Sequence, residues 1–111
     1  ARFIVSETIR EKLFRQLHRE IPYALAVEIQ QFELSDTLLR ADVIVWVEKE
    51  SQKGIIIGKK GEKLRSVGKS AREDLESYFD RKVYLQLWVK VRENWSDDVV
   101  MLRSIGYIEE E

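Results

Sequence analysis

The first hydrophobic pattern along the chain is helical and covers residues 6–20. Its apolar positions recur three or four residues apart and so share one face of a helix: Ile9, Leu13, Phe14 and Leu17. Ser6 is a suitable N-cap, and Thr8 with Glu11 offers an alternative capping box. Because Pro22, the only proline, follows closely, we expect an amphipathic helix that ends just before it.

Three further stretches alternate between apolar and polar residues, which is the pattern of half-buried strands. Residues 24–34 alternate until the phase shifts by one near residues 30–31, and this shift predicts a bulge or a bend. Residues 40–49 follow after a short link, so the first two strands should run antiparallel. Residues 82–91 alternate cleanly and predict a third strand with five core-facing positions: Val83, Leu85, Leu87, Val89 and Val91.

Helical spacing returns between residues 54 and 79 and is interrupted at residues 58–61. We expect a very short helix near residues 53–57 and a longer one whose apolar stripe consists of Leu64, Val67, Ala71, Leu75, Tyr78 and Phe79. Gly68 also falls on that stripe, where a missing side chain would allow close approach to a sheet. A last helix is predicted over residues 96–105.

These elements follow the order αββααβα and predict an α+β fold with a three-stranded sheet and helices packed on one of its faces. No linker, repeat or low-complexity segment divides the chain, so residues 1–111 should form one domain. The opposite face of the sheet would carry Trp46, Tyr84 and Trp88. Their rings suit either base stacking or packing against a C-terminal helix or another domain, and we favour packing.

Composition narrows the classes of protein that this fold can serve. The chain has 111 residues, of which 44% are hydrophobic and 35% are charged, a globular composition rather than a disordered one. It has no cysteine and a single histidine, so disulfides, zinc fingers and multi-histidine metal sites are excluded. No apolar run approaches the roughly 20 residues of a membrane span, and a reduced, cytoplasmic setting fits. The first residue is Ala1 rather than Met, which suggests a fragment of a longer protein.

Charge is sorted along the longer central helix rather than mixed. The chain as a whole carries a net charge of −1, yet residues 58–72 hold six basic residues against one acid, Glu62. The next eight residues hold four acids and no base. A helix dipole favours the opposite arrangement, with acids in the first turn and bases in the last. The distribution therefore favours recruitment of a polyanion to the N-terminal end of this helix.

The centre of the basic stretch has the sequence Gly58-Lys59-Lys60-Gly61. Glycine lets a backbone turn tightly and approach a ligand closely, and the N–H groups that start the following helix favour phosphate. Lys59 and Lys60 add positive charge on long side chains. The sequences of a P-loop and of a dinucleotide-binding loop are both absent, which excludes those phosphate sites. A plain helix–helix turn with solubilising lysines is the alternative.

Gly-x-x-Gly between two helices, behind an apolar lead-in, is typical of the KH module, whose loop clamps the backbone of four nucleotides. Further segments extend the similarity over nearly the whole chain: Pro22-Tyr23, Gln52-Lys53, Ala71-Arg72, and residues 85–91, 95–98 and 102–107. With them the chain resembles the C-terminal, type II KH domain of the bacterial Era family of GTPases. The glycine motif alone is weak evidence, whereas its combination with the other segments is specific.

The resemblance implies a function in ribosome assembly. The KH domain of this family binds the 3′ end of 16S ribosomal RNA during maturation of the small ribosomal subunit. Single-stranded RNA is therefore the expected partner, and DNA is not. GTP and Mg²⁺ would belong to a GTPase domain that these residues do not include, and that domain is a second expected partner. We expect a chain without catalytic activity, cofactor or metal site of its own.

The residues and the resemblance together indicate ten RNA-binding positions: Lys53, Ile56, Ile57, Gly58, Lys59, Lys60, Gly61, Lys63, Leu64 and Arg65. We expect the backbone of residues 58–61 and its two lysines to hold phosphates. Leu64 and the run Ile55–Ile57 would include an apolar floor under the bases, although core packing also explains this run and at most one isoleucine should face the ligand. Lys53, Lys63 and Arg65 would be flanking phosphate contacts.

Two other functions stay open at this stage. A protein-docking module would contact its own GTPase domain or a ribosomal protein, and it would depend on the outward aromatic face rather than on the loop lysines. A KH piece of another RNA-binding factor is the second alternative, and residues 95–98 argue against it. Membrane association has no clear support, because no strongly basic amphipathic helix is free of a core role. The bases that are read and the oligomeric state also stay open.

Overall fold

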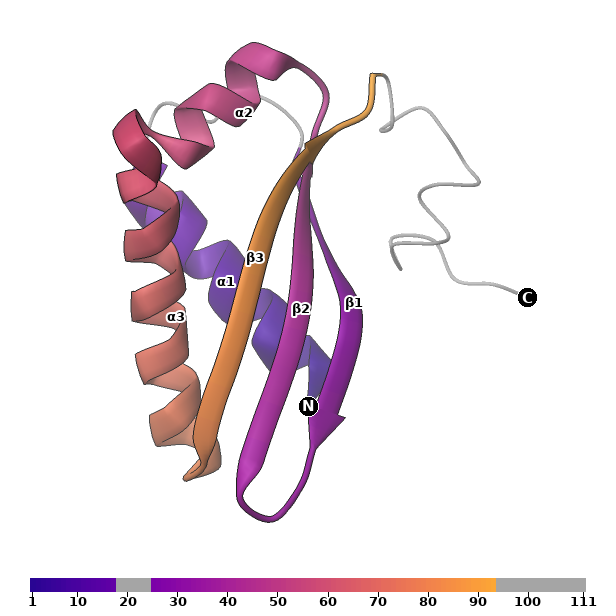
Figure 1. Cartoon of the computed structure of the whole chain (residues 1–111), viewed down its shortest axis with the longest axis vertical. Coiled ribbons are helices and arrows are strands. Elements are labelled where there is room, and N and C mark those ends of the chain that lie inside the picture. The colour runs from indigo at the N-terminus through magenta and orange to yellow at the C-terminus, as the bar shows by residue number, and fades with distance from the viewer. Residues whose placement is uncertain (18–24, 94–111) are drawn as a thin grey trace, which may run out of the picture.

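The computed structural model describes residues 1–17 and 25–93 (Figure 1). In chain order the elements are α1 (Arg2–Leu17), β1 (Ala26–Leu34), β2 (Leu38–Val47), α2 (Glu50–Ile57), the short 3₁₀ helix η2 (Lys59–Gly61), α3 (Glu62–Phe79) and β3 (Lys82–Val91). This order confirms the predicted α+β fold from the first helix to the third strand. The helix predicted over residues 96–105 lies outside the described residues.

The three strands form one mixed sheet with β2 at its centre (Figure 1). β1 pairs with β2 in antiparallel orientation, as predicted, and β3 pairs with β2 in parallel orientation. The register of β1 shifts between Ile29 and Gln31, which confirms the predicted bulge. Because a bulge inserts one extra residue, Phe32 comes to lie opposite Ala41 and packs against the core.

One face of the sheet is covered by helices and holds the hydrophobic core. The core-facing residues of β2 are completely buried: Leu39, Ala41, Val43, Val45 and Val47. On this face α1 packs against β1, α3 packs against β3, and the two helices contact each other (Figure 1). β3 shows the predicted alternation, with Val83 and Val89 buried between exposed neighbours. Within the described residues the helices cover this face, and that cover is the reason why alternation in the sequence locates the strands.

α1 begins four residues before the predicted start, at Arg2 rather than at Ser6. Ser6 therefore lies inside the helix and is not its N-cap. The reason is that the buried stripe begins earlier than the sequence pattern indicates and consists of Val5, Ile9 and Leu13. The sequence pattern predicts Phe14 on that stripe, but Phe14 is 47% exposed, so this prediction is wrong. One residue after Leu13, its side chain points about 100° away around the helix axis.

α2 also begins before its predicted start, at Glu50 instead of Lys53. The side chain of Gln52 explains this early start. Its Oε1 accepts hydrogen bonds from the backbone N–H groups of Glu48 at 2.9 Å and Lys49 at 3.0 Å. These bonds satisfy backbone donors that precede the first turn, and the helix gains one additional turn.

The apolar stripe of α3 is buried at its predicted centre, which consists of Val67, Ala71 and Leu75. At the predicted end of the stripe, Tyr78/Phe79, it is Phe79 that packs against the core, whereas Tyr78 is 66% exposed. Gly68 does lie toward the sheet, yet a Cβ added there would meet only Cδ1 of Leu87, at 3.6 Å. This is an ordinary van der Waals contact, so packing within the protein does not require glycine at this position.

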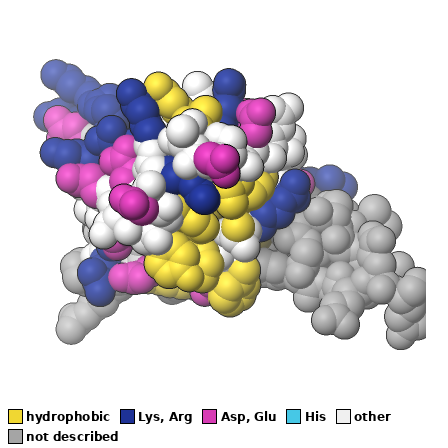
Figure 2. Space-filling model, turned by 90° about the horizontal axis from the view of Figure 1, so that it is seen from below, with side chains coloured by type: hydrophobic (Ala, Val, Ile, Leu, Met, Phe, Trp, Pro, Cys, Tyr) yellow, Lys and Arg dark blue, Asp and Glu magenta, His cyan; other side chains and the backbone are white. Residues whose placement is uncertain are grey.

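Hydrophobic side chains reach the surface at the end of the molecule where α1 begins and α3 ends. Ile4 and Thr8 of α1 line a shallow depression together with Ser77 and Tyr78 of α3. Figure 2 views the molecule from below and shows hydrophobic side chains gathered on the surface there. Phe3, at the start of α1, is 71% exposed. This end of α3 is the one opposite to the glycine motif.

Candidate nucleic-acid interface

Residues 58–61, called the glycine turn below, have a backbone that few residue types adopt. Gly58 has φ 73° and ψ 178°, and Lys60 has φ 57° and ψ 23°. Gly61 has φ 75° and ψ 12°. Glycine adopts positive φ freely, whereas Lys60 is strained by about 1–2 kcal/mol in the left-handed region. The two glycines of the Gly-x-x-Gly motif are therefore required by the conformation of the turn.

Local contacts close the glycine turn. The Gly58 N–H donates to the Gly54 carbonyl at 2.9 Å, and the Gly61 N–H donates to the Gly58 carbonyl at 3.2 Å. A Cβ added at Gly58 would lie 2.7 Å from Cγ of Lys63, so the stem of Lys63 passes directly over this glycine. Gly58 is thus required both by its dihedral angles and by the side chain above it.

The glycine turn exposes two lysines where a helix begins. Lys59 and Lys60 are exposed, and α3 starts immediately afterwards with Gly61 as its N-cap residue. The first turn of a helix presents backbone N–H groups and the positive end of the helix dipole, and both favour an anion. This end of α3 therefore combines backbone and side-chain features that attract a phosphate chain.

A groove of about 590 Å³ lies next to the glycine turn, between α3 and β3. Its lining residues are Gly61, Leu64, Arg65, Gly68, Lys69, Arg72, Leu85 and Leu87. The five residues from α3, together with its N-cap residue Gly61, recur at spacings of three and four and so lie along one face of the helix. At a rise of about 1.5 Å per residue, this helical wall is roughly 16 Å long.

The lining of the groove combines an apolar floor with a basic rim. Leu64, Leu85 and Leu87 are half-buried and pack against the core. The basic rim is formed by three exposed side chains of α3, namely Arg65, Lys69 and Arg72. The described residues that line this groove include no carboxylate. A surface of this kind suits a ligand that has flat apolar groups and regularly spaced negative charges, as a single-stranded nucleic acid does.

Six of the ten predicted site residues come together here. Gly61, Leu64 and Arg65 line the groove, and the glycine turn that contains Gly58, Lys59 and Lys60 adjoins it. The helical break at the motif, the left-handed glycines and the apolar face of α3 thus converge on one place. Their convergence is what distinguishes this turn from a plain connection between two helices.

The remaining predicted residues lie differently. Ile56 is completely buried in the core, so its side chain is not available to a ligand, and its predicted place in the apolar floor is corrected. Ile57 and Lys53 are half-buried on α2 and are not among the residues that line the groove. Lys63 lies over Gly58, beside the groove rather than in it.

Sequence reasoning missed five of the groove residues: Gly68, Lys69, Arg72, Leu85 and Leu87. The signal for the first three was present, because they continue the spacing of three or four residues that begins at Gly61. The two leucines were predicted only to face the core. They stay half-exposed because β3 is an edge strand in the described part of the chain, where no further strand pairs with its outer side.

Two of the acids in the second half of α3 have structural partners. Asp74 forms an ion pair with Lys12 of α1, and Oε2 of Glu76 accepts the backbone N–H of Val83 at 3.2 Å. These contacts account for carboxylates at positions that the helix dipole disfavours. The sorting of charge along α3 is therefore only partly evidence for a ligand, and the basic half carries that argument.

The face of the sheet opposite the helices carries aromatic side chains from β2 and β3. Trp46 is half-buried, and its Nε1–H donates to Oε1 of Glu28 at 2.8 Å. Tyr84 and Trp88 are 51% and 44% exposed, and Nζ of Lys82 lies 5.2 Å from the centre of the Tyr84 ring. Trp46 thus joins two strands, whereas Tyr84 and Trp88 leave aromatic surface open to a partner.

Residues 1–17 and 25–93 offer neither a cluster of metal ligands nor a membrane-spanning helix. Within these ranges, no group of three or more acidic, histidine or cysteine side chains is placed to hold a metal ion. In the same ranges, no helix has both the length and the apolar character needed to cross a membrane.

Residues 20–96 match the family of the KH domain, a stretch longer than half of the chain. The chain belongs to the KH domain family. Its glycine turn between α2 and α3 is the element with which KH domains clamp a nucleic-acid backbone. The resemblance seen in the sequence is confirmed. The groove between α3 and β3 directly adjoins this glycine turn.

The relatives of this KH domain are GTPases named Era. It is 52% identical over 107 residues to GTPase Era of Coxiella burnetii (strain Dugway 5J108-111). It is 53% identical over 106 residues to GTPase Era of Neisseria meningitidis serogroup B. Each match covers 96% of this chain, but the chain spans only 36% and 34% of the length of these relatives.

Two solved structures of Era share the fold of this KH domain. One is a crystal structure of Aquifex aeolicus Era bound to GDP and AlF4⁻, with a TM-score of 0.87 and 38% identity over 97% of this chain. The other is a crystal structure of Era in complex with MgGDPNP and nucleotides 1506–1542 of 16S ribosomal RNA. It has a TM-score of 0.85 and 38% identity over 95% of this chain. The chain covers 37% and 36% of these two proteins.

Proposed function

We propose that this KH domain binds single-stranded RNA in the groove between α3 and β3, with the glycine turn against the phosphate backbone. The observation that carries the proposal is the lining of the groove, in which a leucine floor lies beside a basic rim. A single strand presents unstacked bases together with phosphates and can use both surfaces at once. A similar fold in a complex that contains 16S ribosomal RNA supports the same ligand class.

The cationic and the apolar residues would contact different parts of the RNA. The backbone of residues 58–61 and the Lys59 and Lys60 ammonium groups receive phosphates, and Lys69 and Arg72 continue the positive rim along α3. Lys53 and Lys63 are flanking cations. Leu64, Leu85 and Leu87 form the floor on which bases rest. With about four phosphates neutralised, the logarithm of the binding constant should fall with the logarithm of salt at a slope near −3.

We further infer that the target is the 3′ region of 16S ribosomal RNA in the maturing small subunit. Relatives named Era and the complex with nucleotides 1506–1542 support this target. Residues 1–111 would be one RNA-binding domain of an Era-type GTPase and would not catalyse a reaction themselves. GTP and Mg²⁺ would be held by the GTPase part of such a protein, which would act in the cytoplasm.

A docking function is a second candidate, favoured by one specific observation. Tyr84, Trp88, Phe3 and Tyr78 expose between 44% and 71% of their surface without belonging to the groove. Large aromatic side chains of this kind are enriched at protein interfaces. Their partner would be the GTPase domain or a ribosomal protein, and RNA binding would then not depend on the basic rim.

The decisive experiment measures binding of the chain to a fluorescent RNA that carries the 3′-terminal sequence of small-subunit ribosomal RNA, over a salt series. A scrambled RNA and the double variant Lys59→Asp/Lys60→Asp are the controls. We expect saturable binding that prefers the ribosomal sequence and collapses in the variant, because two repulsive charges replace two attractive ones at the turn. Equal binding of both RNAs would leave a basic surface without sequence readout. Absence of binding by the folded wild-type chain would overturn the proposal in favour of docking.

A further inference from the structure

Arg65 extends from the first turn of α3 back over the glycine turn. Its Nη2–H donates to the Lys60 carbonyl at 2.7 Å. A Cβ added at Gly61 would lie 3.2 Å from Nη1 and 3.9 Å from Cζ of the same guanidinium. One side chain thus bonds to one residue of the turn and rests against the next.

The peptide group between Lys60 and Gly61 is held at both of its polar ends. Its carbonyl belongs to Lys60 and accepts from Arg65. Its N–H belongs to Gly61 and donates to the Gly58 carbonyl at 3.2 Å. A peptide group is planar, so these two bonds fix its orientation.

This peptide follows the one non-glycine residue of the turn that has a positive φ. Lys60, at φ 57°, is in a conformation that lysine seldom adopts. Such a conformation persists only where surrounding contacts hold it. The Arg65 hydrogen bond is a contact that holds it directly, through the carbonyl of Lys60 itself.

We propose that Arg65 is a positioning residue that holds the Lys60–Gly61 peptide in its RNA-binding orientation, in place of the flanking phosphate contact predicted from the sequence. The consequence for affinity rests on the proposed RNA-binding function. Arginine suits this task better than lysine, because its planar fork can donate from one nitrogen while the other lies close to Gly61. The same close approach is a second reason for glycine at position 61.

A phosphate contact and a positioning residue differ in two respects. They contribute differently to the salt dependence of RNA binding, and they differ in whether lysine can replace arginine. A cation that contacts a phosphate contributes about 0.7 to the salt slope for a single strand, and lysine can take its place. A residue that orients a peptide contributes little to the slope, and lysine, a point charge without the fork, cannot replace it. Lys69, one turn further along α3 on the same rim, is the matched phosphate-contact control.

The test compares Arg65→Lys and Arg65→Met with Lys69→Arg and Lys69→Met. Amide hydrogen exchange at Gly61 is measured in the free protein, and RNA affinity is measured over a salt series. We expect Gly61 exchange to accelerate in both Arg65 variants and in neither Lys69 variant. Arg65→Lys should weaken RNA binding by roughly fivefold to tenfold, the usual effect of one lost intramolecular hydrogen bond at an exposed site. Arg65→Met should keep the wild-type slope, whereas Lys69→Met should lower its magnitude by about 0.7.

Two results would overturn the proposal. One is unchanged Gly61 exchange in both Arg65 variants. The other is wild-type RNA affinity in Arg65→Lys together with a reduced slope in Arg65→Met, which would make Arg65 an ordinary phosphate contact. The exchange measurement needs no RNA, so it still decides the positioning role if the wild-type chain fails to bind RNA. The melting temperatures of all four variants confirm that the fold is retained.

Discussion

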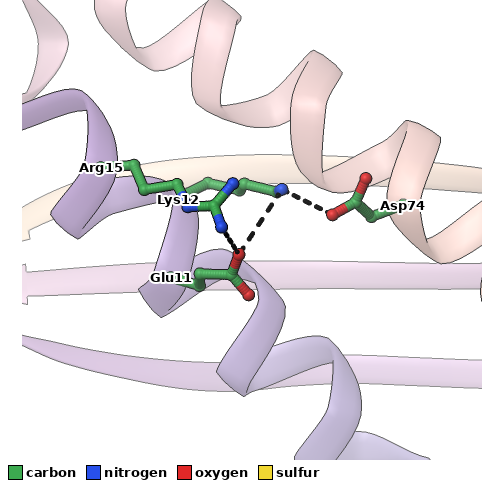
Figure 3. A network of polar contacts seen from close by, with 4 residues as sticks. All are labelled: Glu11, Lys12, Arg15 and Asp74. Carbon is green, nitrogen blue, oxygen red and sulfur yellow. Dashed lines mark ion pairs between the residues drawn. The ribbon is translucent and has the colours of Figure 1, made fainter.

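The ammonium group of Lys12 lies 2.5 Å from Oδ2 of Asp74 and joins α1 to α3 (Figure 3). Lys12 is only 6% exposed, whereas the side chain of Asp74 is 55% exposed. Glu11 lies 3.9 Å from the same ammonium group and also pairs with Arg15 at 3.1 Å. A buried ammonium needs a close acceptor, so this pair holds the second half of α3 against α1. α3 is also the wall of the groove, and the pair therefore supports the site from the opposite end of the helix.

Removal of the acceptor, Asp74, should lower the free energy of unfolding more than replacement of the buried Lys12. Asp74→Asn leaves the Lys12 ammonium buried with only a distant carboxylate, and we expect a loss of roughly 1–3 kcal/mol in the free energy of unfolding. Lys12→Met replaces the buried charge by an apolar side chain of similar length and should stay within about 1 kcal/mol of wild type. Urea unfolding of both variants is the measurement. A larger loss for Lys12→Met than for Asp74→Asn would contradict this assignment.

Gly68→Ala should change stability and RNA binding in opposite directions. The position is helical and the added Cβ finds only an ordinary contact with Leu87, so stability should rise by ~0.5–1 kcal/mol. The same methyl group enters the groove floor. RNA binding should weaken by roughly fivefold or more, because overfilling a packed site costs ~1–3 kcal/mol.

Gly54→Ala is the matched control for this substitution. Gly54 is also helical, a Cβ there would meet nothing within 4 Å, and the residue does not line the groove. Its alanine variant should gain similar stability and bind RNA as wild type does. Thermal melting and fluorescence anisotropy check both variants. Equal RNA affinity for the two variants would show that the ligand does not occupy the groove at Gly68.

The two glycines of the glycine turn should differ in their tolerance of alanine. Gly58→Ala places a Cβ 2.7 Å from Cγ and 2.9 Å from Cβ of Lys63, at dihedral angles that only glycine adopts readily. Gly61→Ala meets only the end of the Arg65 side chain, at 3.2 Å, in the left-handed helical region. We expect a loss of up to about 3 kcal/mol for Gly58→Ala and about 1–2 kcal/mol for Gly61→Ala. Chemical denaturation measures the difference, and the reverse order would refute this account of the turn.

Substitution of the exposed aromatic side chains on the outer sheet face distinguishes RNA binding in the groove from protein docking. The double variant Tyr84→Ala/Trp88→Ala should retain wild-type affinity for the ribosomal RNA oligonucleotide, because neither side chain lines the groove. Their exposure also predicts only a small loss of stability, within about 1 kcal/mol. Anisotropy titration beside the Lys59→Asp/Lys60→Asp variant is the measurement. Loss of RNA affinity in the aromatic variant alone would move the binding surface to the opposite face of the sheet.

Sequence periodicity was sufficient for most of the fold. Alternation placed all three strands, and the phase shift placed the bulge of β1, because one face of the sheet packs against the helices whereas the other keeps exposed positions such as Tyr84 and Trp88. Helix starts were less predictable, since the first turns of α1 and α2 depend on a stripe that begins at Val5 and on the side-chain acceptor of Gln52. Phe14 and Tyr78 show the same limit, because helical spacing alone does not say how wide the buried stripe is.

For the site, the sequence alone determined the glycine turn, the basic character of the N-terminal half of α3 and the family. These features are local, because the need for glycine at positive φ angles and the local charge both depend on residues that are adjacent in sequence. The tertiary structure decided which side chains share the groove. It buried Ile56, brought Leu85 and Leu87 of β3 opposite Leu64 and Gly68 of α3, and placed the Arg65 guanidinium on the Lys60 carbonyl. A groove forms between elements distant in sequence, and its lining depends on how a helix and an edge strand pack together, which no local pattern encodes.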